Sequence, residues 1–421
     1  MDRVIKKIGA REIIDSRGNP TVEARVELES GATGIASVPS GASTGIHEAH
    51  ELRDGDKSRF LGKGVLSCVK NIRDIIAPAL IGMDAGDTVR IDRKMIELDG
   101  SENKANLGAN SILAVSLEAT RAAAVESGLD MYQFIGGKGK HSLPVPMFNL
   151  LNGGAHATNN IDIQEFMIVP HRLSLPDGIR AGCEIYHTLK RMLKDRGLST
   201  AVGDEGGFAP DLESDEEAIA LLCAAIKESG YSTDEIGIAL DVASSEWYEN
   251  GQYVLPKREK VLSADQLIDY YVGLCDRYPI LSIEDGVGED DLDGWKRLTE
   301  RLGKRIMLVG DDLFVTNERR LDMGIRLGIG NAILIKPNQI GSLSETLAVI
   351  KMARENGYEY IISHRSGETY DSSIADIAVA TNAPFIKAGA PCRGERVAKY
   401  NRLLRIESAL PNGGAYGFIN R

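Results

Sequence analysis

Six apolar runs between Ile236 and Ala390 decide the fold: IGIALDV (236–242), ILSIEDG (280–286), IMLVGDD (306–312), AILIKPN (332–338), YIISHRS (360–366) and PFIKAGA (384–390). Each run is short, rich in β-branched residues and flanked by polar or glycine-containing segments. That pattern is typical of a strand buried on both faces of a parallel sheet. The sequence therefore predicts a series of parallel strands.

Segments with helical periodicity lie between these runs, at residues 263–275, 292–303, 317–328 and 343–357. The strand–helix unit of roughly 25 to 40 residues is close to one eighth of a (β/α)8 barrel. In such a barrel the carboxyl ends of the parallel strands open on one face. We therefore expect one pocket to contain the residues that end the runs: Asp241, Glu284, Asp311, Lys336, His364, Arg365 and Lys387.

The first third of the chain has a different pattern. Residues 21–38 alternate apolar and polar positions around Ser30-Gly31, which predicts an antiparallel hairpin. Helical periodicity follows at residues 64–80, 87–99 and 108–128. We predict an α/β protein with an N-terminal α+β capping domain (1–138) and a modified TIM-type (β/α)8 barrel (139–421), divided at a segment rich in glycine and proline.

Composition excludes several classes of function. The chain has 421 residues, 43% of them hydrophobic, and a formal net charge of −12, which argues against nucleic acid or an anionic membrane as a partner. No apolar run is long enough to span a membrane, and the first residues lack the apolar region of a signal peptide. Five scattered cysteines indicate reduced thiols. We expect a cytoplasmic protein.

Three of the strand-end residues are carboxylates: Asp241, Glu284 and Asp311. Two carboxylates about 4 Å apart repel by about 4 kcal/mol at an effective dielectric constant of 20, so a cation should lie between them. An all-oxygen ligand set favours Mg²⁺ or Mn²⁺. The alternative is that each acid pairs with a barrel lysine.

Lys336 and Lys387 are candidate bases, because a divalent cation nearby disfavours the ammonium form and lowers the pKa of a lysine. A Schiff base is the alternative role for a barrel lysine. The sequence His364-Arg365-Ser366 offers a guanidinium and a hydroxyl suited to phosphate or carboxylate. The pattern indicates proton abstraction beside a carboxylate.

Further acids lie before the six runs. Glu165 lies within an apolar run, where a glutamate is either ion-paired or functional. Glu205 follows Asp204 in the glycine-rich segment 203–210, where acids are usually solvated. The local sequence pattern does not decide whether Glu165 or Glu205 has a functional role.

Over its whole length the chain resembles the enolase family. The resemblance rests on motifs in family order: AREIIDSRGNPTVE (10–23), PSGASTGIHEAHELRD (39–54), LGANSILAVSL (107–117), NGGAHATNN (152–160), QEFMIVP (164–170), GDEGGFAP (203–210), ALDVASSE (239–246), SIED (282–285), VGDDLFVTN (309–317), KPNQIGS (336–342), SHRSGET (363–369) and IKAGAP (386–391). Gly286, Thr158 and Tyr370 depart from the usual family residues.

The resemblance implies Mg²⁺-dependent, reversible dehydration of 2-phosphoglycerate to phosphoenolpyruvate through an enolate, within a homo-oligomer. It implies that Asp241, Glu284 and Asp311 bind one Mg²⁺, and that Ser43 reaches a second. Lys336 would then remove the C2 proton, and Glu205, assisted by Glu165, would protonate the leaving hydroxyl. Substrate contacts would come from His156, His364, Arg365, Ser366 and Lys387.

Charge supports a second metal independently, because a phosphate and a carboxylate bring roughly three negative charges. Two rival functions remain open from the sequence. One is a sugar-acid dehydratase or racemase that shares the three metal carboxylates, and the other is a non-catalytic relative retained for binding. Arg365, Ser366 and Glu205 argue against the first, and the retention of every catalytic motif residue argues against the second.

Overall fold

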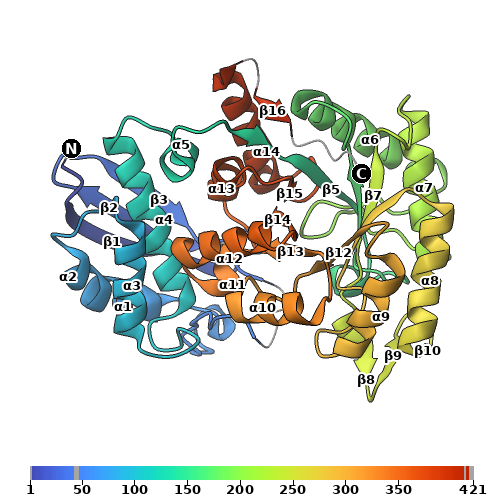
Figure 1. Ribbon diagram of the computed structural model, residues 1–421, viewed down its shortest axis with the longest axis horizontal. Coiled ribbons are helices and arrows are strands. Elements are labelled where there is room, and N and C mark those ends of the chain that lie inside the picture. The colour runs from blue at the N-terminus through green and yellow to red at the C-terminus, as the bar shows by residue number, and fades with distance from the viewer. Residues whose placement is uncertain (1, 42–46, 412–413, 417–421) are drawn as a thin grey trace.

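The computed structural model describes residues 2–41, 47–411 and 414–416. It has two parts that lie side by side in Figure 1: a small sheet with helices α1–α4, and a barrel with its surrounding helices. Within the described residues, no helix combines the length and the apolar composition that crossing a membrane would require.

The barrel is a closed sheet of eight strands in the order β11-β12-β13-β14-β15-β5-β6-β7. The strands are β5 (Val145–Asn152), β6 (Glu165–Val169), β7 (Gly237–Asp241), β11 (Ile280–Glu284), β12 (Met307–Gly310), β13 (Ala332–Ile335), β14 (Glu359–Ser363) and β15 (Phe385–Lys387). All six predicted strands are confirmed. β6 runs antiparallel to both of its neighbours, whereas the other pairs are parallel.

Alternation along the barrel strands separates two apolar layers. Met167, Ala239, Val309, Leu334 and Phe385 belong to a cluster that fills the barrel interior. Their strand neighbours, such as Ile238 and Ile333, pack in the larger cluster beneath the helices. Both faces of each strand are therefore buried, which explains why the predicted runs are continuously apolar.

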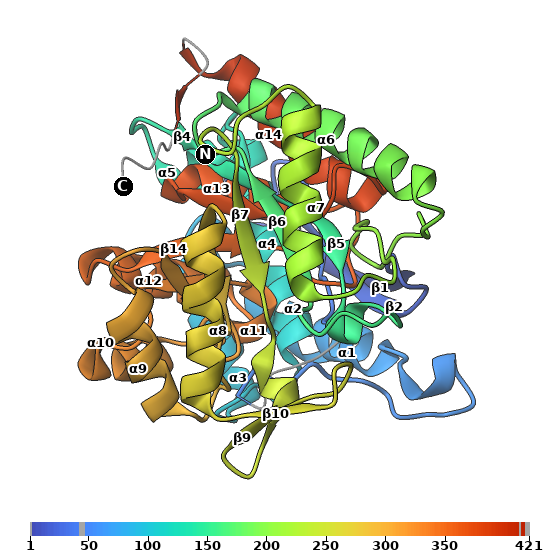
Figure 2. The ribbon, with the colours of Figure 1, turned by 90° about the vertical axis from the view of Figure 1, so that its right-hand side faces the viewer.

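The outer layer consists of α6 (Leu175–Asp195), α7 (Asp215–Glu228), α8 (Ala264–Arg277), α9 (Leu292–Leu302), α10 (Glu318–Leu327), α11 (Pro337–Ile340), α12 (Leu343–Glu355), α13 (Ser373–Thr381) and α14 (Gly394–Ala409). Several helices begin at a serine whose hydroxyl accepts a backbone N–H of the first turn, as Ser214 and Ser342 do. The hairpin β9 (Gln252–Leu255) and β10 (Lys260–Leu262) extends beyond this layer, as Figure 2 shows.

The first domain is a three-stranded antiparallel sheet, β1 (Ile5–Ile14), β2 (Pro20–Leu28) and β3 (Thr33–Ser37), packed against helices. Its helical segments are α1 (Leu66–Asn71), η2 (Ile72–Ile76), α2 (Ala77–Leu80), α3 (Thr88–Asp99), α4 (Ala109–Glu126) and α5 (Met131–Gly136). The predicted hairpin and helices are confirmed. The sequence analysis missed β1, because only Ile5 and Ile8 of this strand are buried.

The two domains meet around the carboxyl ends of the barrel strands. Ser40 forms an isolated β-bridge with Gly367, just beyond β14. Lys104 of the first domain pairs with Glu345 of α12 at 3.1 Å. We propose that the boundary lies at residues 138/139, between α5 and β4 (Ser142–Leu143).

Gly286 follows β11 in a tightly packed site. The sequence alone suggests that Gly286→Pro should stabilise the fold by about 0.4 to 1 kcal/mol if the backbone accepts proline. A Cβ at Gly286 would lie 3.0 Å from Ile283 and 3.1 Å from Leu298, and Asp285 has a φ of 43°, unlike the extended residue that proline prefers before it. We now expect Gly286→Pro to destabilise the fold by about 1 to 3 kcal/mol.

Urea unfolding of Gly286→Pro and wild type measures this effect. Gly9→Ala is a suitable control, because a Cβ there would have no atom within 4 Å. A midpoint for Gly286→Pro equal to or above that of wild type would contradict the prediction.

Candidate active site

Every strand-end residue predicted for the pocket lies at one mouth of the barrel. Asp241 and Glu284 are the last residues of β7 and β11 and are register partners. Asp311, Lys336 and His364 each follow a strand directly. Glu165 reaches the same face for a different reason: it is the first residue of the antiparallel strand β6, opposite Asp241.

Lys387 is the cation at the centre of the acids. Its Nζ lies 2.9 Å from Asp241 Oδ2, 3.0 Å from Glu284 Oε2 and 3.2 Å from Glu165 Oε2. Only 3% of the Lys387 side chain is exposed. Lys336 makes a close ion pair with Asp311. The pairing of acids with barrel lysines, the alternative left open by the sequence, is therefore present in this structure.

These lysines leave negative charge uncompensated. The pKa of Glu284 is raised well above its usual value by burial and by the charge of Asp241, although Lys387 opposes the shift. The atoms that Asp241, Glu284 and Asp311 offer to a metal are all carboxylate oxygens, the ligands that Mg²⁺ prefers. The residues present therefore fit a hard divalent cation as well as they fit the lysines.

Two groups of described residues bring three candidate ligand atoms within 4.8 Å of one another. One contains His156, Glu165 and Glu205, and the other Asp285, Asp311 and Asp312. The predicted set of Asp241, Glu284 and Asp311 is not among these groups. Its carboxylates are instead turned onto the ammonium groups of Lys387 and Lys336.

The pKa of Lys336 is raised, although the sequence analysis expected a lower value beside a divalent cation. Burial acts to lower the pKa, but the charge of Asp311 outweighs it. In the protein alone Lys336 is therefore protonated at neutral pH. A further cation that offset the charge of Asp311 would lower the pKa of Lys336.

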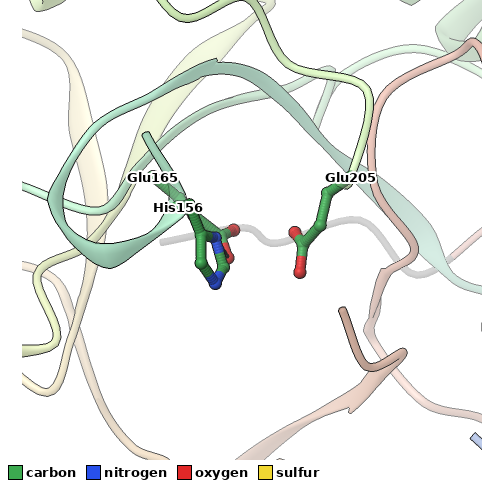
Figure 3. A group of neighbouring side chains, drawn as sticks. All are labelled: His156, Glu165 and Glu205. Carbon is green, nitrogen blue, oxygen red and sulfur yellow. Dashed lines mark ion pairs between the residues drawn. The ribbon is translucent and has the colours of Figure 1, made fainter. Parts of the chain in front are cut away.

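Opposite Lys336 is a pair of buried carboxyl groups, shown in Figure 3. Glu165 and His156 lie side by side, with Nδ1 of His156 3.5 Å from Oε1 of Glu165, and Glu205 faces them. The pKa of Glu165 is raised well above its usual value by burial and by the charge of Glu205. Burial also acts to raise the pKa of Glu205, but His364, His156 and Arg396 hold it well below its usual value. Of the two carboxyl groups, Glu165 is therefore the one that more readily holds a proton.

Arg365 extends from β14 toward the first domain. Its two terminal nitrogens donate to the two carboxylate oxygens of Glu48 at 3.0 and 3.1 Å, and one of them also donates to Asn338. Ser366 follows and accepts from Arg17 at 3.5 Å. This places a guanidinium and a hydroxyl at the same edge of the pocket. Ser43, the expected contact to a second metal, lies outside the described residues.

Two comparisons with family models cover nearly the entire chain. The model described as "Enolase, N-terminal domain" matches residues 5–135, and the model described as "Enolase, C-terminal TIM barrel domain" matches residues 140–420. The chain belongs to the enolase family. This membership supports an enolase-type reaction, and it agrees with the closed barrel and the capping domain described above.

Several residues that build this enolase-type pocket were missed by the sequence analysis. Asp285 accepts the backbone N–H groups of Asp311 and Asp312 at 3.0 and 2.8 Å. Gln339 donates to Asp311 at 2.8 Å, and Asn149 donates to Glu205 at 3.1 Å. Asp285 and Gln339 lie within recognised motifs, so their position beside a candidate ligand was the available signal.

Proposed function

We propose that this enolase-family protein catalyses the reversible, Mg²⁺-dependent dehydration of 2-phosphoglycerate to phosphoenolpyruvate. One observation carries the proposal. Lys336 follows β13 and Glu165 begins β6, four positions apart in the eight-strand order, so the candidate base and the candidate acid pair face each other across the barrel mouth. A substrate held between them could lose a proton on one face and a hydroxyl on the other.

Lys336 is the proposed acceptor of the C2 proton. It is buried, and its ammonium is held by Asp311, which lies at the end of the adjacent strand. When the charge of Asp311 is offset, the buried Nζ loses the interaction that keeps it protonated. Lys336 is then a neutral amine at a fixed position, which is what a general base requires.

The Glu165–Glu205 pair is the proposed source of the proton for the C3 hydroxyl. The pKa of Glu165 is raised well above its usual value and that of Glu205 is held below it, and Glu205 is the member that faces His364. Three buried polar atoms around this pair, His156 Nδ1, Glu165 Oε2 and His364 Nε2, lie in ion-pair contacts but form no hydrogen bond among the described residues. Buried polar groups are normally paired, so these atoms mark a place for a polar ligand.

Arg365 and Ser366 are the proposed phosphate contacts, and Lys387, His156 and His364 are proposed to complete substrate binding. A guanidinium donates two parallel hydrogen bonds to an oxyanion, as Arg365 already does with Glu48. Lys387 contacts the acids that would hold a metal, so metal loading would free its ammonium for the carboxylate of the substrate.

Asp241, Glu284 and Asp311 are the residues that would hold the first Mg²⁺, with Mn²⁺ as a possible substitute, and Ser43 remains the proposed contact to a second. Bound Mg²⁺ supplies positive charge that offsets the carboxylate and the negative charge left by proton removal. A sugar-acid substrate is the competing proposal, and the guanidinium and hydroxyl at the pocket edge favour a phosphorylated one.

A coupled absorbance assay tests the proposal. Purified protein with Mg²⁺ should form phosphoenolpyruvate from 2-phosphoglycerate, and treatment with a chelator should abolish the activity until Mg²⁺ is restored. Activity on unphosphorylated sugar acids but none on 2-phosphoglycerate would contradict the proposed substrate. The homo-oligomer and the cytoplasmic location remain predictions, which light scattering and cell fractionation would test.

Glu48 competes with phosphate for Arg365 in this proposal. Glu48→Gln removes a buried negative charge from the edge of the pocket, so we expect tighter binding of inorganic phosphate and a KM for 2-phosphoglycerate lower by about tenfold, the equivalent of one charged hydrogen bond. Calorimetric titration with phosphate and steady-state kinetics measure these changes.

Glu345→Gln is the matched control for Glu48→Gln, since it also breaks an ion pair between the domains but lies outside the pocket. Weaker phosphate binding in Glu48→Gln would mean that Glu48 orients Arg365 and does not compete with the ligand.

A further inference from the structure

Arg396 is a fully buried arginine in the first turn of α14, and the reaction proposed above assigns it no role. One terminal nitrogen lies 2.7 Å from His364 Nδ1 and donates to the carbonyl oxygen of Arg365 at 2.5 Å. The other donates to the carbonyl oxygens of Ser366 at 2.6 Å and Asp204 at 3.1 Å. Arg396 therefore touches both the strand end that carries His364 and the loop that carries Glu205.

The contact between Arg396 and His364 determines where the imidazole carries its proton. A guanidinium has five N–H donors, no acceptor, and does not lose its proton in proteins. The nitrogen facing it, His364 Nδ1, must therefore be the unprotonated acceptor. Burial lowers the pKa of His364 to about 4, so the ring is neutral at pH 7 and its single proton lies on Nε2.

The Nε2 atom points to the acid pair. It lies 3.2 Å from Glu205 Oε2, which also accepts a hydrogen bond from Asn149 at 3.1 Å. This contact is not a hydrogen bond, and Nε2 has no hydrogen-bond partner among the described residues. A protonated Nε2 thus presents a donor to Glu205 and to any ligand beside it.

We propose that Arg396 is a positioning residue that holds His364 as the Nε2–H tautomer, so that the imidazole always donates toward Glu205 and never accepts a proton from it. The consequence is that the proton used in the proposed reaction is not lost from the acid pair to His364. This inference rests on the proposed function for its catalytic meaning, but the tautomer itself does not depend on the identity of the substrate.

Close packing supports a positioning role. Gly389 has a φ of 88°, and a Cβ there would lie 2.9 Å from Arg396 Cδ and 2.9 Å from the carbonyl oxygen of Glu205. That carbonyl accepts the N–H of Ala390 at 2.9 Å. A larger residue at position 389 would therefore press against both the side chain of Arg396 and the carbonyl of Glu205.

Nitrogen-15 NMR of the full-length protein labelled at histidine tests the tautomer directly. The two ring nitrogens of a neutral imidazole have distinct shifts, and the seven histidines are few enough to assign His364 by its loss in His364→Gln. We expect Nδ1 to be unprotonated and Nε2 protonated. A protonated Nδ1 in the wild type would overturn the proposal, and this measurement needs no folded variant of Arg396.

Arg396→Gln and Arg396→Lys test the catalytic consequence. A glutamine amide can either donate or accept, so Arg396→Gln should show both tautomers of His364 and a kcat lower by about tenfold to a hundredfold. Lysine only donates, so Arg396→Lys should keep the Nε2–H tautomer and recover most of kcat.

Arg402→Gln is the matched control, because Arg402 lies on the same helix but pairs with Asp376 and Asp130. It should change neither the tautomer nor kcat. An unchanged tautomer in Arg396→Gln would overturn the positioning role. If the wild type shows the expected tautomer but is inactive on 2-phosphoglycerate, the proposed function is refuted and the tautomer proposal is not.

Discussion

Glu205→Gln should stop the formation of phosphoenolpyruvate yet still exchange the C2 hydrogen of 2-phosphoglycerate with solvent, whereas Lys336→Ala should stop both. The reason is that the two residues serve separate steps in the proposed reaction. Lys336 is paired with Asp311 on one side of the pocket, and Glu205 lies beside Glu165 and His364 on the other. Removing a general acid or base typically costs a factor of about 100 to 10,000.

Proton NMR in deuterated water follows the exchange, and a coupled absorbance assay follows product. Both variants should retain Mg²⁺ binding, since Asp241, Glu284 and Asp311 are unchanged. Glu249→Gln, on the exposed strand β8 (Tyr248–Glu249), is a control that should retain product formation and exchange. Exchange that persists in Lys336→Ala and disappears in Glu205→Gln would reverse the two assignments.

The parallel strands of the barrel could be predicted because each is buried on both faces. Runs such as AILI at 332–335 are apolar throughout, and a parallel barrel then brings their carboxyl ends together without further information. β1 could not be recognised in the same way, because it lies at the edge of its sheet and most of its side chains are partly exposed.

Sequence patterns could not predict the residues that support the pocket. Arg396 and His364 are 32 positions apart, and Arg365 and Glu48 are 317 apart. No periodicity links such pairs, since their contact is created by the packing of α14 and the first domain against the strand ends. The sequence also left open whether lysines or a metal compensate the acids, because both require the same carboxylates in the same place.

Asp311→Asn should weaken Mg²⁺ binding by about tenfold to a hundredfold or more, and activity should fall with it. Asparagine keeps the size of aspartate and can still accept from Gln339, which donates to Asp311 at 2.8 Å. It lacks the negative charge, however, and neutral oxygens bind hard cations less tightly than carboxylates. The loss should therefore be one of metal affinity and not of folding.

Asp312→Asn is the matched control for this prediction. Burial and the charge of Asp311 raise the pKa of Asp312 to about 8, so its carboxyl group is mostly neutral at pH 7 and already resembles an amide. Calorimetric titration with Mg²⁺ should then show a large loss of affinity in Asp311→Asn and little change in Asp312→Asn. Equal effects in the two variants would mean that the cation is held by the group of Asp285, Asp311 and Asp312 and not by the predicted set of Asp241, Glu284 and Asp311.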